Sequence, residues 1–171
     1  MRKVLCRLAF ACVLVTAGAA QTIPEQLWGT WRIARVVRTS AIACWGEKEA
    51  KGIVGTELEY SADSFRWKNI VTPHPAAKVV LVDAQRFHDE NSGLGATGSQ
   101  VTFDMLGIKA TKAVQIKIAH PDASVTGATT EIPGDAVLIK DARTIIVSAC
   151  NIYFQARRVS LPQTKRKGPA N

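Results

Sequence analysis

The chain has 171 residues, a hydrophobic content of 47% and a formal net charge of +8. Three of the positive charges lie within the first seven residues and three more lie at 165–167, so the intervening chain carries a net charge of only +2. A nucleic-acid-binding domain usually concentrates basic residues on one face. This nearly balanced composition therefore excludes nucleic acid from the expected partners.

The first 20 residues have the layout of a secretory signal peptide. Cationic residues precede an apolar run over 8–16, and small side chains at 17–20 suit cleavage by a signal peptidase. The apolar run is shorter than the roughly 20 residues that a membrane-spanning helix needs. We therefore expect cleavage near Gln21, no transmembrane segment, and a secreted or periplasmic protein. Lipid attachment at Cys12 is the alternative, but this residue lies inside the apolar run.

The rest of the chain is expected to form one domain over 21–160, followed by a basic disordered tail over 161–171. Two cysteines remain in the domain, Cys44 and Cys150. An even count in an exported protein favours one disulfide, and two buried free thiols are the alternative. Neither cysteine has a neighbouring Cys or His at zinc-ligand spacing, so we expect no metal there.

Hydrophobic periodicity predicts many short strands with helices at the margins. Helical segments are expected at 24–27, 46–54 and 83–90, the last with Phe87 directed inward. Strands are expected at 28–38, 56–60, 64–68, 78–82, 113–119, 136–140, 144–148 and 151–159, while 100–103 forms a strand or the edge of a turn. The segment 69–77 contains Pro73-His74-Pro75 and is expected to be irregular. Such short connections exclude parallel crossovers and predict an antiparallel barrel or sandwich.

The two cysteines provide a test of how the sheet closes. Cys44 follows the first predicted strand, and Cys150 immediately precedes the last. If these two strands pair antiparallel, the end of the first lies beside the start of the last. The expected disulfide and the expected pairing therefore support each other. Together they favour an all-β, antiparallel up-and-down barrel of about eight strands.

This pattern resembles the lipocalin-like (calycin) β-barrels, among them small exported bacterial proteins of unassigned function. The matching features are the helical turn at 24–27, Gly29-Thr30-Trp31 opening the first strand, and a cationic side chain late in the last strand. The resemblance implies that Trp31 closes one end of the barrel and that Arg157 or Arg158 packs across its ring. Cation–π attraction and packing favour that contact.

The resemblance also implies a function, because many members of this family bind small apolar ligands and others act as inhibitors. Aromatic side chains near the predicted strands are candidates for lining a ligand cavity, with core packing as the alternative. These candidates are Tyr60, Phe65, Trp67, Phe103 and Tyr153. The first hypothesis is therefore an exported protein that binds a small hydrophobic or amphipathic molecule inside the barrel.

The second hypothesis is a protein-interaction module, such as a periplasmic hydrolase inhibitor. In that case the arm at 21–25 or the loop at 91–99 would insert into the cleft of a target. An enzyme ranks third, because no catalytic constellation is recognisable in the sequence. No cofactor is expected.

Three further motifs have simple structural interpretations. The segment 93–98 matches Gly-x-Gly-x-x-Gly, but a dinucleotide fingerprint needs a hydrophobic strand before it and a helix after it. Glu57 and Glu59 share one face of a strand, which is typical of a solvated surface rather than of a glycosidase pair. The histidines are isolated in sequence, so no metal site is predicted. They are His74, His88 and His120.

Overall fold

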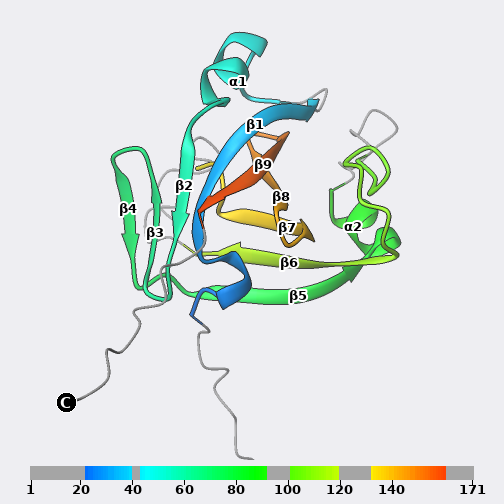
Figure 1. Cartoon of the computed structure of the whole chain (residues 1–171). Coiled ribbons are helices and arrows are strands. Elements are labelled where there is room, and N and C mark those ends of the chain that lie inside the picture. Colours follow the sequence, from blue (N-terminus) through cyan, green and yellow to red (C-terminus); the bar gives the residue numbers. More distant parts are fainter. Residues whose placement is uncertain (1–21, 40–42, 92–100, 120–131, 161–171) are drawn as a thin grey trace, which may run out of the picture.

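Nine antiparallel strands form one curled sheet, a half-barrel, with short helices at its margins (Figure 1). The computed structural model describes residues 22–39, 43–91, 101–119 and 132–160. The expected all-β, up-and-down antiparallel class is confirmed, with nine strands where about eight were predicted. No helix in these ranges has the length and apolar character that crossing a bilayer requires.

The elements follow the predicted order closely. The strands are β1 (Gly29–Thr39), β2 (Glu57–Tyr60), β3 (Ser64–Trp67), β4 (Ile70–Pro73), β5 (Ala77–Asp83), β6 (Lys112–Ile118), β7 (Ala136–Asp141), β8 (Thr144–Ala149) and β9 (Ile152–Ser160). The helices are the 3₁₀ turn η1 (Glu25–Leu27), α1 (Glu47–Ile53) and α2 (Ala84–Asn91). One expectation was wrong: β4 lies within the segment that was expected to be irregular. Of the two alternatives for 100–103, the described residues 101–103 agree with the edge of a turn, because they form no strand and a turn begins at 103.

The order of strands in the sheet is β4-β3-β2-β1-β9-β8-β7-β6-β5. The first strand therefore pairs with the last, as predicted, and β4 and β5 form the two edges of the described sheet. The sheet curls strongly. A hydrogen bond of 2.8 Å shows this, since Tyr60 at the end of β2 donates to the carbonyl of Gly134, just before β7. Those two strands are separated by β1, β9 and β8 in the sheet. We call the face enclosed by this curl the inner face.

The inner face is filled by the protein's own side chains. Its core joins residues of β1, β2 and β3 to residues of β6, β7, β8 and β9. The largest fully buried members include Trp31, Ile33, Leu58, Phe65, Ile116, Ile145 and Phe154. Burying a side chain of this kind contributes roughly 1.5–3 kcal/mol relative to its exposure, so this core is a principal stabilising feature of the fold.

A second core covers the opposite, outer face of β5–β9. Phe87 of α2 and a turn-rich segment over 101–108 pack there against Val82, Ala113, Leu138, Ile146 and Tyr153. Strands β7 and β8 are consequently apolar on both faces, as is usual for strands that are covered on both sides. The outer face of β1–β4, in contrast, carries exposed charged pairs such as Arg32 with Glu57.

The disulfide that the sequence predicts joins Cys44 to Cys150, with their Cα atoms 5.2 Å apart. It lies beside the Thr39–Ile152 pair, where the ladder between β1 and β9 ends. Cys150 and Asn151 have φ values of 53° and 58°, and they form the whole connection between β8 and β9. Two consecutive residues with positive φ are typical of the type I′ turn that matches the twist of a hairpin.

Candidate functional site

Trp31, near the start of β1, and Arg158, near the end of β9, are in direct contact. The Arg158 guanidinium carbon lies 4.0 Å from the centroid of the Trp31 ring. The same guanidinium donates to the carbonyls of Trp28, Gln26 (2.6 Å) and Ala142 (3.1 Å), and burial lowers its pKa. Of the two arginines considered from the sequence, Arg158 therefore occupies this position, while Arg157 is exposed on the outer face.

The five aromatic candidates do not converge on one cavity. Tyr60 and Phe65 stack with their ring centroids 4.9 Å apart, inside the inner core. Complete burial raises the pKa of Tyr60 well above its ordinary value, and the nearby Asp135 charge adds to the shift. Trp67 is half-buried at the margin of this core and donates to the Thr56 hydroxyl at 3.1 Å. These three residues act as packing residues.

The other two candidates belong to the outer core. Phe103 lies 5.2 Å from Phe87, centroid to centroid, and Tyr153 meets Phe87 edge-on at 6.4 Å. Tyr153 lines a cavity, whereas Phe103 packs behind the Phe87 ring. The candidate binding site therefore lies beneath α2, on the outer face of the sheet, and not on the inner face.

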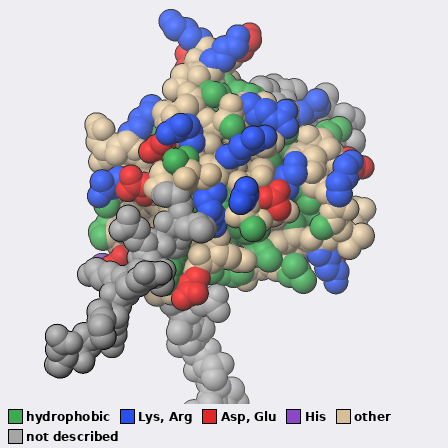
Figure 2. Space-filling model, in the orientation of Figure 1, with side chains coloured by type: hydrophobic (Ala, Val, Ile, Leu, Met, Phe, Trp, Pro, Cys, Tyr) green, Lys and Arg blue, Asp and Glu red, His purple; other side chains and the backbone are tan. Residues whose placement is uncertain are grey.

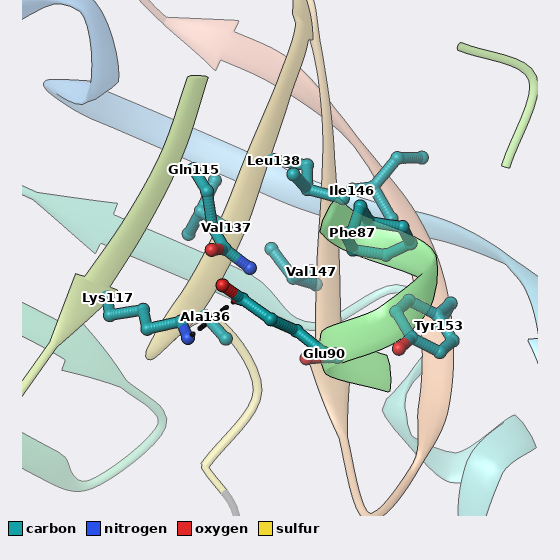
Figure 3. Close-up of a pocket in the computed structure, with 11 residues that line it drawn as sticks. Phe87, Glu90, Gln115, Lys117, Ala136, Val137, Leu138, Ile146, Val147 and Tyr153 are labelled. Atoms are coloured by element: carbon teal, nitrogen blue, oxygen red, sulfur yellow. Dashed lines mark ion pairs between the residues drawn. The ribbon is translucent and has the colours of Figure 1, made fainter. Parts of the chain in front are cut away.

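A cavity of about 100 Å³ lies between α2 and the outer side of β6–β9 (Figure 3). Phe87, Leu138, Ile146 and Tyr153 provide most of its apolar wall. Figure 3 shows that the side chains of Gln115, Lys117 and Glu90 meet at one side of this space, with Phe87 and Tyr153 at the other. Ala136, Val137, Val147 and Ser148 complete the lining.

The polar side of the cavity combines a buried amide with an ion pair. Gln115 is only 7% exposed, and its side-chain amide faces the cavity. Lys117 Nζ lies 3.6 Å from a Glu90 oxygen. A hydrogen bond from Arg86 lowers the pKa of Glu90, partial burial opposes that shift, and the Lys117 charge adds to it. The carboxylate is thus held ionised between two cations.

Local sequence fixes α2 over the cavity. Asp83 ends β5, and its carboxylate accepts a hydrogen bond of 2.8 Å from the backbone N–H of Arg86, as in an N-cap. Arg86 and Glu90 form an i,i+4 ion pair at 2.7 Å on the same helix. Phe87 and Glu90 are three residues apart, so both side chains reach the same side of the helix, toward the sheet.

No family model, curated protein or solved structure matches this chain. The geometry of the site must therefore carry the functional conclusion. Sequence reasoning expected Phe87 to point inward but did not identify Gln115, Lys117, Glu90 or Ser148 as site residues. A signal was present, since 136–139 and 145–147 are apolar at consecutive positions, which indicates strands covered on both faces.

The remaining motifs have no role in this cavity. Glu57 and Glu59 pair with Arg32 and Arg66 on the exposed outer face, at 2.6 and 3.7 Å. Within the described ranges, no three His, Cys, Asp or Glu side chains are grouped so as to hold a metal ion. His74 is exposed in a turn, and His88 lies 3.3 Å from Asp89. His120, the Gly-rich segment 93–98 and most of the loop 91–99 lie outside the described residues.

The described part of the N-terminal arm is packed into the molecule. Ile23 is completely buried in the inner core, and its carbonyl accepts a hydrogen bond of 2.8 Å from the Trp28 indole. An arm held in this way is a structural element that packs into the inner core beside η1. The geometry thus gives no support to its insertion into another protein.

Proposed function

We propose that this protein binds a small amphipathic molecule in the cavity between α2 and the outer face of the sheet. The observation that carries the proposal is the side chain of Gln115, which is 7% exposed and turns its amide into a cavity whose other walls are mostly apolar. A hydrogen bond from a ligand to this amide would contribute about 0.5–1.5 kcal/mol to binding, in addition to the contacts with the apolar wall.

The lining limits the chemistry of the ligand. An apolar cavity of about 150 Å³ is enough to hold benzene, so the buried part of the ligand here is no larger than a small ring or a branched alkyl group. Gln115 can both donate and accept, which suits a primary amide, an alcohol or a protonated acid. Glu90 and Lys117 neutralise each other, so the pair favours a ligand group without net charge.

We propose that the protein performs this role outside the cytoplasm, as an exported member of the lipocalin-like barrels. The leader-like first 20 residues and the Cys44–Cys150 disulfide support an oxidising compartment. The pairing of β1 with β9 and the contact of Arg158 with Trp31 support the kinship. The proposed ligand site differs from the family's barrel interior, because the inner face is filled by side chains such as Phe65 and Phe154.

Ligand-observed NMR with a panel of small amides and alcohols, including isobutyramide and isobutanol, tests the proposal. We expect weak, saturable binding to the wild-type protein. Gln115→Leu keeps the apolar volume but removes the hydrogen bond, and Ala136→Leu fills the cavity, so each should reduce affinity at least about tenfold, which corresponds to 1.4 kcal/mol. Glu59→Gln, on the outer face away from the cavity, should bind like the wild type.

Two outcomes would contradict the proposal. One is the absence of saturable binding by any member of the panel. The other is binding that persists unchanged in both Gln115→Leu and Ala136→Leu while their circular dichroism spectra match that of the wild type. The second result would show that the ligand binds at a different part of the molecule.

A further inference from the structure

Three arginines of β1 lie on the same face of the sheet although they are three residues apart in sequence. Arg32, Arg35 and Arg38 pair with Arg157, Gln155 and Tyr153 of β9, respectively. Strand residues alternate between faces, so a spacing of three would normally place Arg35 toward the inner core. Two register shifts, between Ile33 and Arg35 and between Val36 and Arg38, each insert one residue into β1.

Simple alternation along the first strand would place Arg35 on the apolar side, and the two bulges prevent this. With them, Ile33 and Val36 remain on the inner face and all three arginines point outward. Two residues of β9 advance the strand by about 7 Å, so the arginines form a line roughly 14 Å long. We call Arg32, Arg35, Arg38 and Arg157 the arginine row.

The arginine row is poorly neutralised. Arg32 pairs with Glu57 at 2.6 Å, but it also stands directly opposite Arg157. Like charges at directly opposed positions destabilise a sheet. Arg38 and Arg157 have no carboxylate partner among the described residues, and all four arginines are exposed. Figure 2 shows Lys and Arg side chains gathered over the region where Figure 1 places β1 and β9.

Arg35 is held in place by a neutral group. Its Nε and Nη2 atoms both donate to the side-chain oxygen of Gln155, at 3.2 and 2.9 Å. Gln155 is buried, so it provides a fixed acceptor that orients the guanidinium without cancelling its charge. The remaining N–H groups of Arg35 stay available for an anion, and a guanidinium matches the geometry of carboxylate and sulfate-like groups.

We propose that the arginine row binds a linear acidic polysaccharide. Its form, one line of charges along a strand, suits an extended chain that carries regularly spaced anionic groups. Proteins that bind single-stranded nucleic acid add exposed aromatic rings on which bases stack. Tyr153, the aromatic residue in the described part of this line, is only 8% exposed and so offers no such platform. The proposal is independent of the cavity beneath α2.

Fluorescence anisotropy with labelled oligosaccharides of dextran sulfate and of polygalacturonate tests this proposal on the full chain. The variant Arg35→Gln/Arg38→Gln/Arg157→Gln is compared with Lys48→Gln/Lys78→Gln/Lys112→Gln, which removes the same charge from exposed lysines elsewhere. Both variants keep the basic residues at 165–167. We expect the arginine variant to lose at least about tenfold in affinity and the lysine variant less than about twofold, with a weaker salt dependence in the arginine variant alone.

Single-stranded DNA of similar length and vesicles of phosphatidylcholine and phosphatidylserine (7:3) provide the competing ligands. Preference for either oligosaccharide, lost in the arginine variant, supports the proposal. Equal losses in the two variants, no binding to either oligosaccharide, or tighter arginine-dependent binding to the DNA or the vesicles would overturn it. If the triple arginine variant does not fold, Arg157→Gln alone, at an exposed position, should still weaken binding, and unchanged affinity would count against the proposal.

Discussion

At the scale of single residues, Arg158 links β9 to three other parts of the chain. It stacks on Trp31 of β1 and donates to carbonyls in and next to η1 and in the β7–β8 turn. Hydrogen bonds from a charged group contribute about 1.5–3 kcal/mol each at best, and Arg158 is half-buried, so the combined effect is smaller than their sum. The residue therefore acts as a clamp between the N-terminal turn and the last strand.

We predict that Arg158→Met lowers the free energy of unfolding by about 2 kcal/mol, because it keeps the packing on Trp31 and removes the hydrogen bonds. Arg158→Lys keeps the charge but lacks the planar fork, so it should recover less than half of that loss. Urea unfolding followed by tryptophan fluorescence measures both values. Wild-type stability in Arg158→Lys would show that the fork geometry has no importance here.

Tyr60 makes the stability of the protein sensitive to alkaline pH. In the unfolded chain a tyrosine titrates near pH 10, whereas burial and the Asp135 charge raise the pKa of Tyr60 well above that value in the folded protein. The folded state retains a proton that the unfolded chain releases. The stabilising contribution is therefore complete below about pH 10 and declines as the pH rises toward the folded-state pKa.

We predict that the free energy of unfolding of the wild type falls above pH 10 by up to about 1.4 kcal/mol per pH unit from this residue. Tyr60→Phe should show a shallower decline, together with a loss of about 1 kcal/mol at pH 8 from the missing hydrogen bond to Gly134. Urea titrations between pH 8 and 11 provide the measurement. Equal slopes in the two proteins would assign the alkaline sensitivity to other groups.

At the scale of elements, α2 is held to the sheet mainly by Phe87. This side chain is 1% exposed and contacts Phe103 and Tyr153. We predict that Phe87→Ala destabilises the protein by about 3–4 kcal/mol, through lost burial and the cavity that remains. Met105→Ala, in the same covering layer but 44% exposed, should cost less than about 0.5 kcal/mol. Near-ultraviolet circular dichroism and urea unfolding would detect both effects, and similar losses in the two variants would contradict this role.

Most of the strands that were predicted correctly alternate in polarity, and the continuously apolar β7 and β8 are marked by the turns at their ends. β4 was missed because Pro73-His74-Pro75 resembles a break, yet Pro73 lies at the end of an edge strand, where a missing N–H is tolerated. The bulges of β1 were missed because a period of three is not a strand period. The residues of β9 alternate regularly between the two faces. Pairing with β9 therefore leaves Ala34 and Val37 of β1 as the extra, bulged residues.

The candidate site was harder to predict than the elements. Aromatic residues were correctly placed on strands, but alternation within one strand does not say which face will be covered by a distant helix. Gln115 alternates with Val114 and Ile116 and therefore resembles a solvent-facing residue. It is buried only because α2, more than twenty residues earlier in the chain, packs over that face.

At the scale of the whole molecule, the pairing of β1 with β9 joins the two ends of the domain. The described sheet ends at β4 on one side and at β5 on the other, so this central pairing holds the two halves of the sheet together. The position of the cysteines predicted the pairing, because each lies next to one end of the paired strands. The open edges were not predictable in that way, since no residue pair marks them in the sequence.

The Cys44–Cys150 disulfide should stabilise the whole domain rather than one element. It joins residues 106 positions apart, beside the last residue pair of β1 and β9. In the chain-entropy model, a loop of this size contributes about 4–5 kcal/mol, and measured values are often lower.

We predict that Cys44→Ala/Cys150→Ala lowers the free energy of unfolding by about 3 kcal/mol, with a fall of about 6–12 °C in Tm. Wild-type protein reduced with dithiothreitol is the matched control, because it loses the cross-link without loss of either side chain. An unchanged unfolding midpoint in both the variant and the reduced protein would show that the pairing of β1 with β9 is stable without the disulfide.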